Sequence, residues 1–187
     1  MFDYILGIPA HPLMIHFAIV FLVLLVAGAA VYALVPPLRR RIWWAVAGLA
    51  VAGPLAAWFA KLSGEKLFNM LVAQNYPKEI MDQVNTHLTY GGKTLYFSLG
   101  LGAATLVLVL MSSPLARGGR EATPAGRGDG SAIGNRPASE GETRRASMFA
   151  TIGLSIVVLV LAGFTGYYVF KTGDTGAHAV WGSFTEK

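Results

Sequence analysis

The sequence predicts an all-α membrane protein, an antiparallel up-down bundle of four transmembrane helices that forms a single membrane domain. Hydrophobic residues make up 54% of the 187-residue chain and charged residues only 13%, about half the charged fraction of an ordinary soluble domain. A spanning helix needs roughly 20 apolar residues, and four stretches meet this requirement: residues 13–35, 42–60, 89–111 and 149–170. The connections between the first three favour antiparallel neighbours.

Each span has features that fit a helix in lipid. The first runs without a charge from Leu13 and stops at Pro36-Pro37. The second contains Pro54, which is tolerated when neighbouring groups satisfy the carbonyl that proline leaves free. The third has Lys93 near its start, where a long side chain can reach the interface. Small residues recur along the second, third and fourth spans, and such stripes let helix backbones approach closely.

The two longer connections differ in character. Residues 65–72 and 78–88 alternate apolar and polar side chains with a near-helical period, and Pro77 between them suits the start of a helix. We therefore expect two short amphipathic helices on the outer face of the bundle, the second running into the third span. Residues 112–147 are rich in Gly, Ser, Pro, Arg and Glu, a composition that predicts a disordered linker on the cytoplasmic side.

The charge distribution predicts the orientation of the bundle. All nine arginines fall in the first and third connections with four acidic residues, whereas the opposite side carries six lysines and six acidic residues. The positive-inside rule places the arginine side in the cytoplasm, so both termini are expected to face outward. The N-terminus lacks a basic region and a cleavage site, so no removable signal peptide is expected. The basic residues are not interleaved with aromatic residues on one face, so the predicted partner is the lipid bilayer and not nucleic acid.

All four histidines fall on the outer side: His11, His16, His87 and His178. Imidazole is the commonest metal ligand, and an antiparallel bundle brings these segments together. Five residues on a helix correspond to about 500°, so His11 and His16 point apart and each needs partners from other helices. We expect His16, Glu65 and His87 to converge, with His11 near the rim. The same side chains could instead cap helix ends or form ion pairs.

Cysteine is absent from the chain. This excludes disulfides, thiolate metal sites, Cys-ligated iron–sulfur clusters and thioether-linked haem. The residues also contain no nucleophile signature that would support a hydrolase.

The opening run resembles that of a known family. Ile8-Pro-Ala-His-Pro-Leu-Met-Ile-His-Phe-Ala-Ile, ahead of four apolar spans, is similar to the motif H-P-x-x-[VI]-H-F-x-I of the DUF2231 family of bacterial membrane proteins. Ser63-Gly-Glu65, the pair His87 and Gly91, and the run from Gly166 to Ala177 also resemble family features. The resemblance covers the four spans and leaves out the inner linker.

The resemblance implies a multi-pass protein of the bacterial cytoplasmic (inner) membrane. Relatives include fusions to Rieske-type iron–sulfur domains, which implies respiratory or other redox membrane proteins as partners and b-type haem as a cofactor. By position, the residues that match the motifs are His11, His16, Glu65 and His87.

Three hypotheses for the function stay open. In the first, the chain is an electron-transfer subunit and His16 and His87 are the axial pair of one b-type haem. In the second, a zinc, copper or iron ion binds to His11, His16, Glu65 and His87. In the third, the chain is a non-catalytic structural or interaction subunit of a membrane complex. In each case we expect a redox or accessory subunit and not a stand-alone enzyme.

Overall fold

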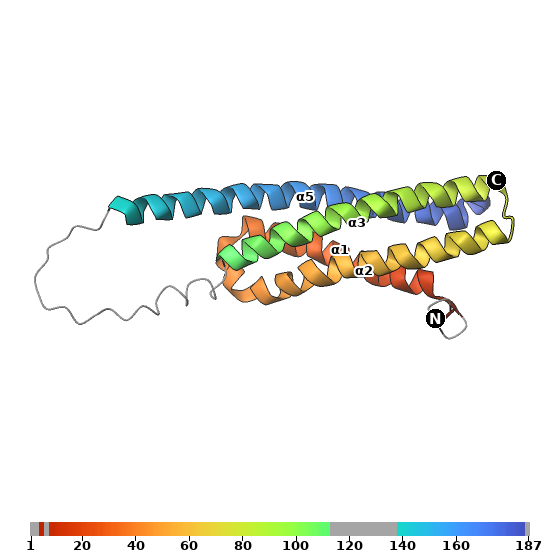
Figure 1. The fold of residues 1–187 in the computed structure, drawn as a ribbon, viewed down its shortest axis with the longest axis horizontal. Coiled ribbons are helices and arrows are strands. Elements are labelled where there is room, and N and C mark those ends of the chain that lie inside the picture. The colour runs from red at the N-terminus through yellow and green to blue at the C-terminus, as the bar shows by residue number, and fades with distance from the viewer. Residues whose placement is uncertain (1–3, 6–7, 113–137, 186–187) are drawn as a thin grey trace, which may run out of the picture.

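Four long helices dominate the computed structural model, which describes residues 4–5, 8–112 and 138–185, with side chains over 11–112 and 145–178. The helices run side by side (Figure 1), so the predicted all-α four-helix bundle is confirmed. The elements in chain order are β1 (Tyr4–Ile5), β2 (Ile8–Pro9), α1 (Ala10–Leu34), the 3-10 helix η1 (Pro36–Leu38), α2 (Arg39–Ala73), α3 (Lys78–Ser112) and α5 (Ala138–Thr185). The two short strands pair antiparallel ahead of α1.

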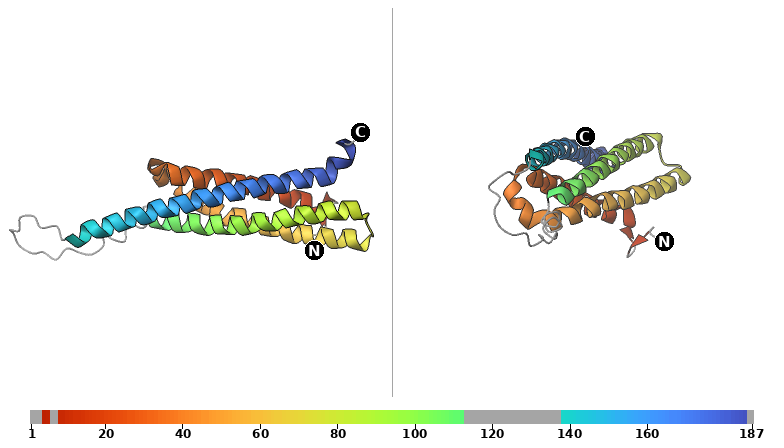
Figure 2. Two further views of the ribbon diagram at one scale, coloured as in Figure 1. Left: turned by 90° about the horizontal axis from the view of Figure 1, so that it is seen from above. Right: turned by 60° about the vertical axis from the view of Figure 1, so that its left-hand side comes forward.

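The four helices form a closed ring of neighbours. Helix α2 packs against α1 and α3, and α5 packs against α3 and α1, so α1 and α3 stand at diagonal corners. The two further views in Figure 2 show the same arrangement from above and obliquely from one end. The shared core contains Leu25, Tyr32, Ala50, Leu101 and Val158, each at most 3% exposed.

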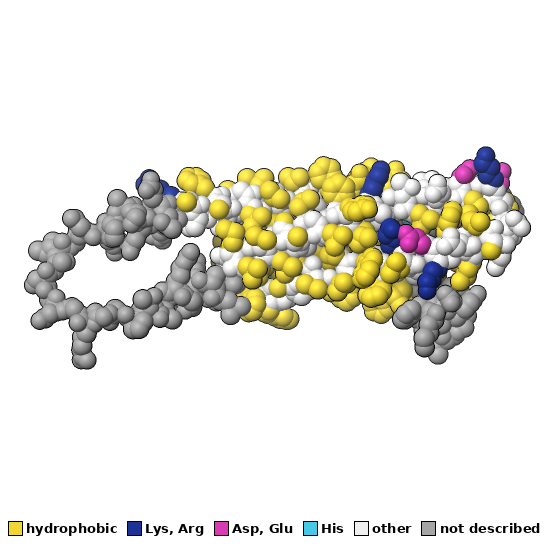
Figure 3. All heavy atoms as spheres, in the orientation of Figure 1, with side chains coloured by type: hydrophobic (Ala, Val, Ile, Leu, Met, Phe, Trp, Pro, Cys, Tyr) yellow, Lys and Arg dark blue, Asp and Glu magenta, His cyan; other side chains and the backbone are white. Residues whose placement is uncertain are grey.

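The surface of the bundle indicates a membrane protein. Within the described residues, four helices are long and apolar enough to cross a membrane: His11–Leu34, Pro36–Ala73, Lys78–Ser112 and Arg145–His178. Apolar side chains cover much of the middle of the face drawn in Figure 3, and charged side chains are few on it. An apolar surface of this extent is not tolerated in water by a soluble monomer, so the chain is a multi-pass membrane protein with lipid around its helices.

Helices α2 and α3 approach closely where Pro54 interrupts the hydrogen bonding of α2. Proline has no N–H, so it leaves the carbonyl of Ala50, four residues earlier, without its helical donor. A Cβ added to Gly102 of α3 would lie 2.5 Å from that carbonyl oxygen and 3.1 Å from Cγ of Pro54. Only a glycine backbone can approach so closely, which is why the small residue stands at this point of α3.

The outer connection differs from the prediction in one respect. Residues 65–72 and 78–88 are helical as predicted, and the second segment runs into the third span within α3 as expected, but residues 65–72 continue α2 instead of forming a separate short helix. Both helices run on past the start of α1 and meet in a turn at Asn75, whose φ is +53° (Figure 1). Helix α2 continues through Ser63 and Gly64, and the hydroxyl of Ser63 bonds back to the carbonyl oxygen of Ala60 within it.

Part of the predicted linker, residues 112–147, lies in described helices. Residues 138–147, predicted to be disordered, already belong to α5. Residues 113–137 lie outside the described part of the chain. At its other end α5 continues through Gly173 and Gly176 to Thr185, so the segment that carries Asp174 and His178 is helical.

We call the end of the bundle where α2 follows α1 the arginine end. One side chain joins the helices there. Arg39 turns back and donates hydrogen bonds from Nε to the carbonyl oxygen of Tyr32 (2.7 Å) and from Nη2 to that of Ala33 (2.9 Å). Its Nη2 also donates to Oγ of Ser155 at 3.3 Å, which links α2 to α5. Arg39 therefore satisfies carbonyl groups that the last turn of α1 would leave without a donor.

Candidate functional site

The opposite end of the bundle, which we call the histidine end, carries His11, His16, His87 and His178. Helices α1 and α3 begin there, and α2 and α5 approach their ends there. The expectation that all four histidines lie at one end is therefore confirmed. The four side chains lie in different environments, however. His11 and His87 lie together as a candidate site, whereas His16 and His178 lie apart from it.

His11 lies in the first turn of α1 and contacts α2. Its Nδ1 is 2.8 Å from Oγ of Ser63. The hydroxyl of Ser63 already donates its single hydrogen to the carbonyl oxygen of Ala60, at 2.8 Å. Nδ1 of His11 must therefore carry the proton and donate it to Ser63, because a hydroxyl has only one hydrogen to give.

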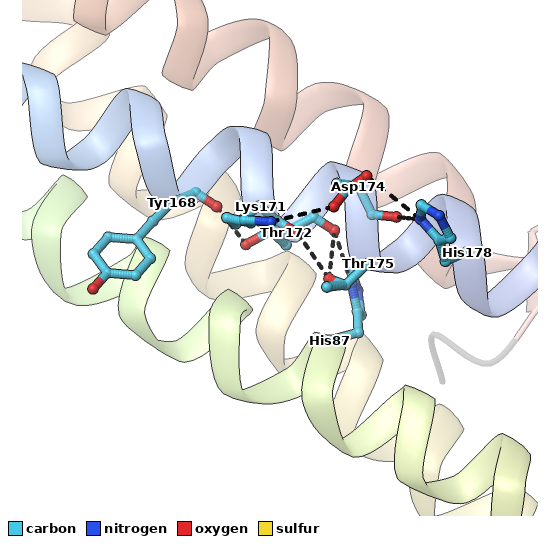
Figure 4. Close-up of polar contacts among 7 residues, drawn as sticks. All are labelled: His87, Tyr168, Lys171, Thr172, Asp174, Thr175 and His178. Carbon is cyan, nitrogen blue, oxygen red and sulfur yellow. Dashed lines mark hydrogen bonds and ion pairs between the residues drawn. The ribbon is translucent and has the colours of Figure 1, made fainter.

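His87 makes the equivalent contact between α3 and α5. Its Nδ1 donates to the carbonyl oxygen of Thr172, at 3.0 Å, and Oγ1 of Thr175 lies 3.4 Å away (Figure 4). A backbone carbonyl only accepts hydrogen bonds, so Nδ1 of His87 also carries the proton. When these rings are neutral, their partners therefore fix the same tautomer for both, with the proton on Nδ1 and the lone pair on Nε2.

Each imidazole also packs against a glycine of the helix that holds it. A Cβ added to Gly64 would lie 2.9 Å from Cε1 of His11, and one added to Gly176 would lie 3.0 Å from Cε1 of His87. A larger residue at either position would push the ring aside. The hydrogen bond and the glycine contact together determine where each ring lies.

The two rings meet near the axis of the bundle. Their centroids are 6.4 Å apart and their planes stand at 81°, although α1 and α3 occupy diagonal corners. No described residue forms a hydrogen bond with Nε2 of His11 or His87. The arrangement resembles that of metal-ligating histidines, in which one ring nitrogen is held by a carbonyl or hydroxyl group and the other binds the ion.

The other two predicted ligands lie apart from this pair. His16 is exposed, and its Nδ1 bonds within α1 to the carbonyl oxygen of Pro12 at 2.6 Å. Glu65 is also exposed and forms an ion pair with Lys61, at 2.6 Å. In the described part of the chain, no three residues among His, Asp and Glu are gathered in a group that could hold a metal ion. The expected convergence of His16 and Glu65 on His87 is not seen there, and their roles as ligands stay predictions.

His178 has a local partner on its own helix. Its Nδ1 lies 2.9 Å from the carbonyl oxygen of Asp174 and 3.4 Å from the carboxylate of the same residue (Figure 4). Asp174 also pairs with Lys171, at 3.6 Å. Both His178 contacts are within one turn of α5, and its side chain is 71% exposed, so it takes no part in the pair.

Sequence reasoning did not assign roles to the residues that hold the two rings. Ser63 with Gly64, and Thr175 with Gly176, each place a hydroxyl residue directly before a glycine. This repeated pattern, in the two helices that end at the same side as the histidines, is the signal that could have found them. A second hydroxyl contact extends the network inward, since Oγ1 of Thr94 and Oγ1 of Thr172 are 2.8 Å apart.

Comparison with known proteins adds no assignment. No protein-family model, curated protein or solved structure gives a significant match to this chain. The resemblance of the opening motif and of Ser63-Gly-Glu65 to the DUF2231 family stays a prediction based on those residues.

Proposed function

We propose that this chain is a membrane subunit in which His11 and His87 together bind one transition-metal centre. The observation that carries the proposal is the pair itself: two imidazoles from diagonal helices, 6.4 Å apart, each with Nδ1 held by its neighbour. A neutral imidazole presents a lone pair that suits zinc, copper or iron. Holding the other nitrogen makes the ligand more basic and orients it.

The packing around the pair favours a single ion over haem. Each ring lies against a glycine of the adjacent helix, with no room for a Cβ between them. A porphyrin is much wider than an imidazole and would require the helices to move apart at this level. If haem is nevertheless bound, His11 replaces His16 in the axial pair predicted from the sequence, and the group supplies one-electron transfer.

An ion held by His11 and His87 alone would lack a full set of ligands. Tetrahedral metal sites use four ligands, and sites with reactive positions leave some of them to water or substrate. We therefore propose that water or a group from a partner protein completes the coordination. The arginine distribution supports placing this centre on the outer face of the cytoplasmic membrane, and the resemblance supports redox membrane proteins as partners.

A second candidate function is a purely structural one. The same contacts join α1 to α2 through His11 and α3 to α5 through His87, which stabilises the histidine end without any metal. In that case the chain would be a non-catalytic subunit of a membrane complex, and both histidines would serve only to join helices.

Elemental analysis and an oxidised-minus-reduced visible spectrum of the protein, purified in mild detergent, separate these proposals. The expected result is one metal ion per chain without a Soret band, lost in His11→Ala and in His87→Ala and retained in His16→Ala. A Soret band lost in the same two variants would identify haem as the centre. Neither metal nor Soret band in the wild-type protein, even after incubation with zinc, copper and iron salts, would overturn the metal proposal and favour the structural one.

A further inference from the structure

A groove on α5 lies next to Lys93, the one basic residue within the apolar part of α3. The groove has a volume of about 440 Å³ and is lined by Val160, Gly163, Phe164, Tyr167 and Tyr168. These residues cover eight steps of helix, or about 12 Å, which is most of the roughly 15 Å that one leaflet contributes to the hydrocarbon core. The floor of the groove is open because a Cβ at Gly163 would meet nothing within 4 Å.

Lys93 of α3 stands at the histidine end of this groove. Its ammonium lies 5.4 Å from the ring centre of Tyr90 and 5.7 Å from that of Tyr168, and Tyr168 is itself part of the groove wall. Phe97 continues the wall, because its ring stacks on Tyr168 at 5.0 Å and on Phe164 at 5.2 Å. The cation and the groove therefore form one continuous surface.

Two aromatic rings hold the ammonium of Lys93 in place, but no described carboxylate neutralises its charge. Aromatic rings attract a cation through their quadrupole and carry no counter-charge. Among the side chains that the structure describes, the lysine ion pairs involve Lys61 and Lys171, and no carboxylate lies within ion-pair distance of Lys93. Lys93 is also exposed, so its ammonium remains open to an anion from outside the chain.

We propose that this surface binds an anionic phospholipid, with the phosphate at Lys93 and an acyl chain along the groove. Tyrosine and lysine at this level are typical of the headgroup boundary, and the groove below them runs into the apolar part of the bundle. A second copy of this chain fits less well, since the same face of an identical partner would bring another positive charge. This inference does not depend on the metal centre.

The test uses the full chain in bilayer nanodiscs that contain equal amounts of phosphatidylglycerol and phosphatidylcholine with identical acyl chains. After mild detergent extraction, native mass spectrometry counts the lipids that stay bound. The expected result is enrichment of phosphatidylglycerol, reduced about fivefold in Lys93→Met, the factor that corresponds to one cation at an anionic surface. Lys66→Met is the control, because Lys66 is also exposed but lies away from the groove.

A second pair of variants tests the groove itself. Gly163→Leu fills it and should reduce the retention of both lipids, whereas Gly153→Leu on the same helix should not, and neither Cβ meets an atom within 4 Å. The proposal is overturned if wild-type protein shows no preference for phosphatidylglycerol, or if Lys93→Met keeps it. A dimer that Gly163→Leu converts to a monomer would also overturn it, since the groove would then be an interface between copies.

Discussion

The two ends of the bundle both contain a polar cluster among apolar helices, but they use their polar groups differently. At the arginine end, Arg39 donates to Tyr32, Ala33 and Ser155. The hydroxyl of Tyr32 donates to Oγ of Ser112, at 2.9 Å, because Ser112 gives its own hydrogen to the carbonyl oxygen of Leu108. The hydroxyl hydrogens of Tyr32 and Ser112 are thus both donated within the protein.

At the histidine end the polar groups are used only in part. Nδ1 of His11 and Nδ1 of His87 each donate a hydrogen bond to a neighbouring helix. Nε2 of each ring has no hydrogen bond with any described residue. A polar cluster whose hydrogen-bonding groups are all used inside the protein serves to join helices, whereas one that retains lone pairs can also bind a ligand.

Replacing Arg39 by alanine should destabilise the protein most. The change leaves the carbonyl groups of Tyr32 and Ala33 without their donor, at a cost of about 2–3 kcal/mol for hydrogen bonds to a charged group. Thermal unfolding in a single detergent measures the loss. Arg40→Ala is the matched control, since Arg40 is exposed and should change stability little. Metal content should stay unchanged in both variants, because the histidine end is not altered.

Adding a methyl group at Gly64 or Gly176 should disrupt the histidine end. The new Cβ would lie 2.9 or 3.0 Å from an imidazole carbon, so the ring must move, at a cost of about 2 kcal/mol in stability. We expect bound metal to be lost in the same variants, as judged by elemental analysis. Gly173→Ala, on the same helix as Gly176, should behave as wild type, because its Cβ would meet nothing within 4 Å. Equal metal content in all three variants would contradict the account.

Ser63→Ala should affect metal binding more than folding. It removes the hydroxyl that holds Nδ1 of His11, and loss of such a supporting partner typically weakens metal affinity about tenfold or more. A zinc titration against a competing chelator gives the affinity. Ser63→Thr should retain it, since the hydroxyl remains. A structural role for His11 alone predicts a small stability loss and no change in this titration.

Tyr32→Phe should have the smallest effect of the set. It removes one hydrogen bond to Ser112, worth about 1 kcal/mol, and leaves the ring in its fully buried place. The melting temperature should fall slightly while zinc affinity stays at the wild-type value. A change in zinc affinity would show that the two ends are coupled, and would contradict separate roles for the arginine end and the histidine end.

The sequence predicted the architecture well because lipid imposes strong rules on composition. Uncharged apolar runs, the double proline at 36 and 37 and the arginine distribution were enough to place four antiparallel helices. The same reasoning predicted helices in the outer connection, the second of them running into the third span, but not that the first would continue α2. The second span was predicted to end at residue 60, whereas in the structure α2 continues through Gly64, which makes room for His11.

The pairing of His11 with His87 could not be predicted from the sequence. The spacing correctly indicated that His11 and His16 point apart, but not which of them faces the bundle axis. His11 lies seven residues before Ala18 and so continues the buried positions Ala18, Leu22 and Leu25. Because α1 is apolar on every side, no polar face marks its outer surface, and the rotation of such a helix depends on its partners.

The measurement that tests the central claim most directly is a long-range ¹H–¹⁵N spectrum of the imidazole groups, before and after one equivalent of zinc. Without metal, His11 and His87 should show a protonated Nδ1 and a bare Nε2. With zinc, the Nε2 signals of these two residues should shift together, and those of His16 and His178 should not. Zinc that leaves both Nε2 signals in place, or that shifts only His16, would contradict the account.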